Sequence, residues 1–166
     1  MLAKDDPNII FTGAIFGADK DTILRNAWVF CLPSSMEGLP ISLLEGMSYG
    51  KVCIASDITA NKEALGDSGI WVKKENAEDI TYALDRLYTN FENYEWQKKV
   101  NRERCERLFS WPKIAKDYID FLSQLIKKFG RINDAELRTF QALCKSVVGV
   151  SPFCNVPENA EVLFDC

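Results

Sequence analysis

Two acidic residues, Glu37 and Glu45, stand in a stretch whose spacing suits the binding of a carbohydrate. Seven residues separate them, and Gly38-Leu39 directly follows the first. A carboxylate accepts two hydrogen bonds side by side, so each acid suits the vicinal hydroxyls of a sugar. Gly38-Leu39 offers slim backbone at the start of a predicted helix, where free N–H groups and the helix dipole favour an anion. The pattern predicts a ligand with a phosphate flanked by two polyols, such as a nucleotide sugar.

The residues around these acids predict a strand, a loop, a helix and a second strand. Residues 28–32 and 52–55 are short apolar runs typical of buried parallel strands. Pro40 suits the first turn of a helix over residues 41–49, and Gly50 suits its end. Glu45 should share one side of this helix with Ile41 and Ser42. Open parallel sheets bind ligands beyond the carboxyl ends of their strands, so we expect the site at the loop after residue 32.

The motif resembles the Glu-x7-Glu signature of glycosyltransferase family 4, a large group of retaining enzymes with the GT-B fold. The similar residues run from Glu37 to Met47 (EGLPISLLEGM) and continue through Gly50 into VCIASD. Flanking segments also match in order. NIIFTG (8–13) resembles the preceding strand, GIWV (69–72) the last strand and FSWPKIAKDYIDFL (109–122) the closing helix. Glu63 falls where the family often has a Glu. The resemblance covers roughly residues 7 to 128, which makes it more specific than a lone motif.

The resemblance implies a role for each residue of the motif. Glu37 would hold the donor sugar and is the catalytic candidate, Glu45 would hold the ribose, and backbone amides between them would meet the diphosphate. The implied donor-binding set is Glu37, Gly38, Leu39, Pro40, Ile41, Ser42 and Glu45. Pro40 stands where many members have Gly and cannot donate an amide hydrogen bond. Lys51 replaces a common Pro. Neither a metal nor a cofactor is implied beyond the nucleotide-diphosphate sugar that serves as donor.

The same resemblance implies an α/β fold, namely a partial Rossmann-like GT-B C-terminal domain. We expect a mostly parallel sheet of about four short strands, at residues 8–12, 28–32, 52–55 and 70–72, with flanking helices and extra C-terminal helices. In the strand order 3-2-1-4-5-6, the family's first two strands would lie between the strands at 8–12 and 28–32. We expect this nucleotide-sugar-binding domain over residues 1–130, followed by a tail over 131–166 that holds one helix, at 134–148, and an irregular end.

The implied activity is transfer of a sugar, with retention, from a nucleotide-diphosphate sugar to a saccharide or lipid-linked acceptor in polysaccharide assembly. By this resemblance, the sequence is expected to start inside the donor-binding domain, without the acceptor domain and the family's opening Arg and Lys. We therefore expect a fragment, split half or remnant that is inactive alone and needs a chain or segment supplying the missing N-terminal half. One alternative is a non-catalytic module that binds nucleotide weakly or pairs with a separate acceptor-domain chain. Another is a receiver-type domain, but the Gly13-Ala14 turn supplies none of the acidic cluster that such a domain needs.

Composition narrows the class of protein further. Hydrophobic residues make up 47% and charged residues 27%, which is ordinary for a soluble globular protein. No apolar run approaches the ~20 residues of a membrane span, and the polar N-terminus shows no signal peptide, so a cytoplasmic location is expected. The absence of histidine excludes His-based acid–base catalysis and His metal ligation within this chain.

The six cysteines fit free thiols in a reducing compartment. Cys31 and Cys53 fall within the apolar strand runs and are expected in the core. Cys144, Cys154 and Cys166 are spaced unlike the paired ligands of zinc sites, so packing thiols or a loose tail are expected there.

Charge is distributed unevenly along the chain. Residues 98–131 hold ten Lys or Arg against four acids, a net charge of +6 on a chain whose total is −4. Such a basic band is either a solvated helix face or a peripheral contact with anionic lipid headgroups at the inner membrane face. Nucleic acid is not an expected partner, because the band lacks interleaved stacking aromatic residues.

The remaining sequence predicts further helices. One is expected over residues 19–27, and another starts after Asn76, with Asp79 completing a capping box. A mostly polar helix over 94–108 should be anchored by Trp96, Val100 and Leu108. Ser110 should cap the next helix, whose expected buried stripe is Trp111, Ile114, Ala115, Tyr118, Leu122, Leu125 and Ile126.

Overall fold

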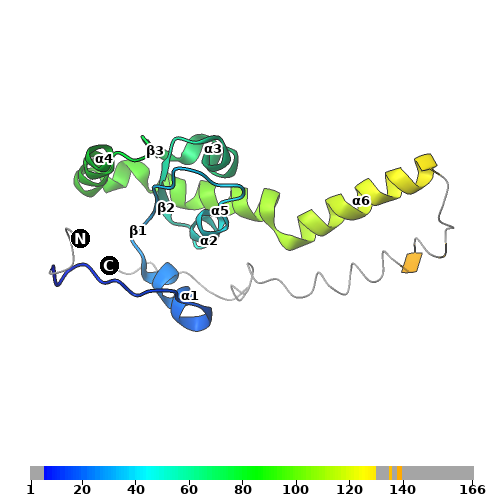
Figure 1. Cartoon of the computed structure of the whole chain (residues 1–166), viewed down its shortest axis with the longest axis horizontal. Coiled ribbons are helices and arrows are strands. Elements are labelled where there is room, and N and C mark those ends of the chain that lie inside the picture. Colours follow the sequence, from blue (N-terminus) through cyan, green and yellow to red (C-terminus); the bar gives the residue numbers. More distant parts are fainter. Residues whose placement is uncertain (1–5, 130–134, 136–137, 140–166) are drawn as a thin grey trace.

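The structure is a computed structural model that describes residues 6–129 and positions 135, 138 and 139. The sheet comprises β1 (Val29–Leu32), β2 (Val52–Ser56) and β3 (Ile70–Val72). The helices are α1 (Gly17–Asn26), α2 (Ile41–Ser48), α3 (Thr59–Leu65), α4 (Ala77–Thr89), α5 (Trp96–Phe109) and α6 (Trp111–Phe129), with short 3-10 turns η1 (Gly66–Ser68) and η2 (Phe91–Tyr94). Figure 1 shows the sheet between these helices, with α6 extending away from the rest. The α/β class and the helices flanking a parallel sheet are confirmed.

The sheet is parallel and has the order β1-β2-β3. Val29 pairs with Val52 and Leu32 with Ala55, while Ile54 pairs with Ile70. This order matches the second half of the strand order expected for a doubly wound sheet. The strands predicted at 28–32, 52–55 and 70–72 are therefore confirmed, with shifts of one residue at their ends.

The strand predicted at residues 8–12 does not form. This segment has no strand conformation and is exposed, including the apolar side chains Ile10 and Phe11. A single strand is stable only when it pairs with neighbours. The expected sheet order does not place this segment beside β1, and the described residues contain no other strand for it to pair with.

Both faces of the central strand are covered. All five residues of β2 are buried, and their alternation sends Cys53 and Ala55 to one face and Val52 and Ile54 to the other. The first face packs against α2, α3 and α5 in a core formed by Leu43, Leu44, Met47, Cys53, Ala55, Ala64, Leu65 and Cys105. The second face packs against α4, where Ala83 and Leu87 are buried with Val72. Burial of the Cys53 thiol raises its pKa to about 12.

Cys31 was expected in the core together with Cys53, but it lies on β1, which is an edge strand of the described sheet. The Cys31 side chain is exposed, so its predicted place in the core is wrong, whereas the same prediction for Cys53 is confirmed. The two residues have the same local pattern of neighbours. Only the central or edge position of the strand separates them, and that position is set by tertiary structure.

Helix α5 buries polar residues where apolar anchors were predicted. Trp96 and Val100 are 52% and 39% exposed, so they are not anchors. The residues of α5 that are buried instead are Gln97, Asn101 and Cys105. Asn101 is satisfied because its Nδ2 donates to the Lys51 carbonyl at 2.8 Å and its Oδ1 accepts from Ser68 Oγ at 2.5 Å. A buried amide with such partners costs little, and it fixes α5 against the start of β2.

The predicted helix boundaries are largely correct. Asn76 caps α4 through a 2.9 Å hydrogen bond from the Asp79 amide to its side chain, and the Ser110 carbonyl accepts the Ile114 amide at the start of α6. The stripe predicted on α6 is less buried than expected, because Trp111 and Tyr118 are exposed. Figure 1 gives the reason, since most of α6 extends past the sheet and the other helices.

The predicted tail falls mostly beyond the described part of the chain. Of the helix predicted at 134–148, positions 135, 138 and 139 are described and helical. The remainder of that helix, the irregular end and Cys144, Cys154 and Cys166 lie outside the described residues.

Helix α2 lies unusually close to β1 at Gly46. A Cβ atom at this position would stand 2.7 Å from Cγ of Phe30. We predict that Gly46→Ala lowers the free energy of unfolding by about 1–3 kcal/mol, because overpacking forces the ring or the helix to move. Urea denaturation followed by circular dichroism measures this loss. Gly38→Ala is the control, since a Cβ there would meet nothing within 4 Å. Equal midpoints for wild type and Gly46→Ala would contradict the packing argument.

Candidate functional site

The loop after β1 carries the first predicted acid at the carboxyl end of the sheet. Leu32 ends β1 and Ile41 begins α2, so Glu37 and Gly38 lie in the loop between them. Glu37 is half-buried, Gly38 and Leu39 are exposed, and Pro40 is buried. The loop therefore has the predicted location, with a buried proline at the helix entry and an exposed turn before it.

Two buried polar residues hold this loop onto the end of β2. The hydroxyl of Ser56 donates to the Ser34 carbonyl, and Asn61 Nδ2 donates to the Ser56 carbonyl at 3.0 Å and to its hydroxyl at 3.1 Å. Both Ser56 and Asn61 are fully buried. Sequence reasoning missed them, because a serine at a strand end and an asparagine in a short helix carry no distinctive pattern. Their effect is to fix where the loop with Glu37 begins.

The start of α2 leaves several backbone donors unused. The amides of Leu43 and Leu44 donate to the Pro40 carbonyl, at 3.0 and 3.1 Å, and the Ile41 amide donates to the Leu39 carbonyl at 2.9 Å. In the described part of the chain, the amides of Gly38, Leu39 and Ser42 have no acceptor. These are the donors that an anion at a helix N-terminus would accept from.

Helix α2 presents the predicted polar side to the surface. Ile41 and Ser42 are exposed and Glu45 is half-buried, while Leu43, Leu44 and Met47 are buried. Spacing by three and four residues places Ile41, Ser42 and Glu45 on one side, as predicted. The opposite side packs on β1 and β2. The packing that buries the leucines thus orients Glu45 outward.

Glu45 has a partner that the sequence did not reveal. Lys20 Nζ of α1 lies 2.6 Å from Glu45 Oε1, and the two side chains are 35% and 20% exposed. Figure 1 shows α1 to one side of the sheet, separated in sequence from α2 by β1 and the loop. Lys20 occupies one carboxylate oxygen and leaves the other free to accept from a ligand. No local motif marks Lys20, because the contact depends on how α1 packs.

Lys51 anchors the other end of α1. Its Nζ donates to the Arg25 carbonyl at 2.6 Å, in the last turn of α1. Burial lowers the pKa of Lys51, and the nearby charge of Lys98 lowers it further. The replacement of a common Pro by Lys51 therefore has a structural consequence, which is a direct link between α1 and the start of β2.

Glu63, the remaining acid of the resemblance, stands apart from this site. It lies exposed on α3, and its carbonyl accepts from Arg104 Nη2 at 2.9 Å. Arg104 Nε also donates to the Ala64 carbonyl at 2.7 Å, so the guanidinium caps the end of α3.

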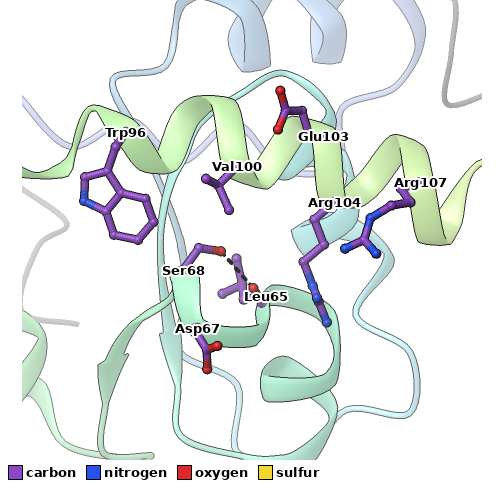
Figure 2. Close-up of a pocket in the computed structure, with 8 residues that line it drawn as sticks. All are labelled: Leu65, Asp67, Ser68, Trp96, Val100, Glu103, Arg104 and Arg107. Carbon is purple, nitrogen blue, oxygen red and sulfur yellow. Dashed lines mark hydrogen bonds between the residues drawn. The ribbon is translucent and has the colours of Figure 1, made fainter.

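Two of the cavities in the described part of the chain adjoin these elements, and neither of the two is lined by Glu37 or Glu45. The smaller, about 240 Å³, lies between α5 and the turn η1. Figure 2 shows Arg104 and Arg107 on one side and Asp67 on the other, and a hydrogen bond from Ser68 Oγ to the Leu65 carbonyl. Because Arg104 is occupied by backbone carbonyls and the charges of both signs are balanced, we assign this cavity a structural role. The larger cavity lies at the amino ends of β1 and β2.

The described residues contain no cluster of three or more Cys, Asp, Glu or His side chains that could hold a metal ion. Among these residues, no helix has the length and apolar character needed to cross a bilayer.

Glu37 and Glu45 flank a helix N-terminus at the carboxyl edge of a parallel sheet, the edge at which open α/β folds bind ligands. Residues 1–90 match the family model of the glycosyl transferases group 1. The chain belongs to this family.

Curated relatives are also glycosyltransferases. The chain is 37% identical over 82 residues to the N,N'-diacetylbacillosaminyl-diphospho-undecaprenol alpha-1,3-N-acetylgalactosaminyltransferase of Campylobacter jejuni, which covers 46% of this chain and 22% of that protein. It is 25% identical over 125 residues to an uncharacterised glycosyltransferase of Methanocaldococcus jannaschii, covering 74% and 32%. It is 26% identical over 119 residues to a serotype-specific mannosyltransferase of Escherichia coli, covering 72% and 14%. The chain thus spans between about a seventh and a third of the length of these relatives.

The ion pair between Lys20 and Glu45 links α1 to α2, so the stability of α1 should depend on this contact. We predict that Lys20→Met speeds amide exchange in α1 by up to about fivefold, because a partly exposed ion pair stabilises by at most about 1 kcal/mol. Hydrogen exchange followed by mass spectrometry measures this change. Lys62→Met is the matched control, since Lys62 pairs with Asp57 at 2.5 Å and its loss should leave α1 unchanged. Identical exchange of α1 in wild type and Lys20→Met would show that the pair does not anchor the helix.

Proposed function

We propose that this chain is the donor-binding part of a retaining glycosyltransferase that uses a nucleotide-diphosphate sugar. The observation that carries the proposal is the group of unbonded amides at Gly38, Leu39 and Ser42, with Glu37 before them and Glu45 after them. Free amides at a helix N-terminus suit a diphosphate, and carboxylates on either side suit hydroxyls.

Each acid has its own part of the donor. Glu37, in the loop, accepts from hydroxyls of the sugar and is the catalytic candidate, because it would stand beside the carbon that reacts. Glu45, one and a half turns into α2, accepts from the ribose hydroxyls through the oxygen that Lys20 leaves free. Pro40 supplies no amide, so the diphosphate depends on Gly38, Leu39 and Ser42.

Charge limits how tightly this part of the protein binds a donor. A carboxylate about 6 Å from a phosphate repels it by about 3 kcal/mol at an effective dielectric near 20, before screening by salt. The ammonium of Lys20 offsets part of that repulsion, because it neutralises Glu45. Fixed donors aimed at the departing diphosphate would then stabilise the charge that develops as the glycosidic bond breaks.

The acceptor is proposed from the relatives. The Campylobacter relative is named for a diphospho-undecaprenol acceptor, and the Escherichia relative for a serotype-specific mannosyl transfer. We infer a saccharide or lipid-linked acceptor, bound with the help of a chain or segment that supplies the other half of the enzyme. The reaction belongs to polysaccharide assembly at the cytoplasmic face of the membrane, with the protein in peripheral contact.

Isothermal titration calorimetry with UDP, GDP and their sugar conjugates tests the assignment of the two acids. Glu45→Ala should weaken both the nucleotide and the nucleotide sugar by about tenfold or more, since hydrogen bonds to a charged group contribute about 1.5–3 kcal/mol. Glu37→Ala should weaken the nucleotide sugar alone, because the free nucleotide has no donor sugar.

Glu63→Ala is the matched control, because it removes an exposed acid on α3 whose carbonyl contact with Arg104 is retained. If Glu45→Ala binds as well as the wild type, or if Glu63→Ala is equally impaired, the ribose assignment is wrong. If Glu37→Ala weakens nucleotide and nucleotide sugar alike, its assignment to the sugar is wrong.

A further inference from the structure

The larger cavity lies at the edge of the sheet opposite the candidate donor site. Its volume is about 660 Å³, and its lining includes Trp28 just before β1 and Lys51 just before β2. Glu37, by contrast, follows the carboxyl end of β1. Parallel strands place all their amino ends at one edge, so the cavity and the donor site are at opposite edges. No step of the proposed donor binding uses this cavity.

Basic residues predominate over acidic ones in the lining of the cavity. Its lining holds four basic residues, Lys51, Lys98, Lys99 and Arg102, against the single acid Glu95. Glu95 pairs with Lys98 at 3.0 Å.

The other two basic residues of α5 have acidic partners outside the lining. Lys99 lies 3.8 Å from Glu103, and Arg102 lies 2.9 Å from Glu106. Such exposed pairs one turn apart on a helix contribute little to stability, so Lys99 and Arg102 can exchange their acidic partners for a ligand at little cost. The cavity therefore keeps an excess of positive charge that a bound anion would neutralise.

Two of these cations also repel each other. Lys51 is half-buried, and both burial and the charge of Lys98 lower its pKa. Its Nζ already donates to the Arg25 carbonyl, but an ammonium has two further N–H donors. A phosphate between Lys51 and Lys98 would accept from both and remove the repulsion between them.

The exposed side chain of Trp28 lines the same cavity and contacts Tyr88, which lies outside the lining. Trp28 is 45% exposed, stacks on Phe91 with ring centroids 4.6 Å apart, and meets the ring of Tyr88 edge-on at 6.3 Å. Tyr88 is 80% exposed, and Lys98 Nζ lies 4.7 Å from the centre of the Phe91 ring. Trp and Tyr beside Lys and Arg are the residues that proteins place at the headgroup level of a bilayer.

We propose that this cavity binds the phosphate of an anionic phospholipid headgroup, with Trp28 and Tyr88 at the bilayer interface. The aromatic border favours a lipid over a free phosphate ester, since a small soluble anion gains nothing from Tyr88. This inference rests on the peripheral membrane contact proposed above but on no residue of the donor site, so nucleotide titrations and vesicle binding can fail independently.

Flotation with vesicles of phosphatidylcholine, with and without phosphatidylglycerol, tests the proposal. We expect binding only to the anionic vesicles, weakening as salt is added. Lys98→Gln with Arg102→Gln should reduce partitioning about thirtyfold, because each basic residue near an anionic surface contributes roughly fivefold. The matched control is Lys113→Gln with Lys116→Gln on α6, which removes the same charge away from the cavity and should change partitioning by less than about threefold. Equal losses in the two double variants would show a general charge effect and overturn the proposal.

A second arm separates the source of the phosphate. Titration with sn-glycerol 3-phosphate, followed by NMR shifts of the Trp28 indole, reports the phosphate contact without a membrane. Trp28→Ala should keep this contact, monitored at Lys98, but lose vesicle binding. Binding of glycerol phosphate without any vesicle binding would overturn the lipid assignment, and binding of neither would overturn the site. If the double variant at Lys98 and Arg102 proves unstable, the exposed Lys99→Gln should still lower partitioning about fivefold.

Discussion

The close approach of α2 to β1 determines where the candidate donor site lies. Gly46 faces Phe30 with no room for a side chain, and the neighbouring residue on the helix is Glu45. Because the helix is held at this contact and by its buried leucines, the backbone of Glu45 is fixed relative to the strand. The loop before α2 is fixed at its other end by the hydrogen bond between Ser56 and Ser34. The contact of Gly46 with Phe30 and the hydrogen bond of Ser56 to Ser34 thus position the backbone around Glu45 and Glu37.

Charge is arranged along α2 in the sense that the helix dipole favours. Glu37 stands before its first turn, where the N-terminal end of a helix is positive, and Lys51 follows its last turn, where the other end is negative. Helix α1 is held next to α2 at two points, because its Lys20 pairs with Glu45 and its Arg25 carbonyl accepts from Lys51 Nζ.

The central β1-α2-β2 unit is predictable from the sequence because its signals are local. Apolar runs, Pro40 and Gly50 mark its boundaries, and the spacing of Ile41, Ser42 and Glu45 gives the exposed side of the helix. The ion pair between Lys20 and Glu45 is not predictable, since it joins residues whose neighbours give no indication of the contact.

Three further differences have the same origin in long-range structure. Asn101 is buried because Ser68 and Lys51 satisfy it, Cys31 is exposed because its strand is at an edge, and residues 8–12 form no strand because pairing requires a neighbour. A single sequence shows none of these partners, although it shows the periodicity of each segment.

The outer side of β1 has backbone groups without partners in the described sheet. Within the described sheet, β1 pairs only with β2, so alternate N–H and C=O groups from Val29 to Leu32 face outward. An extended polypeptide laid along them would continue the sheet by main-chain bonding, whatever its side chains. Pro33 comes immediately afterwards and has no N–H, which confines such an added segment to a few residues. The exposed thiol of Cys31 lies in the middle of this short template, where a chemical label would report its occupation.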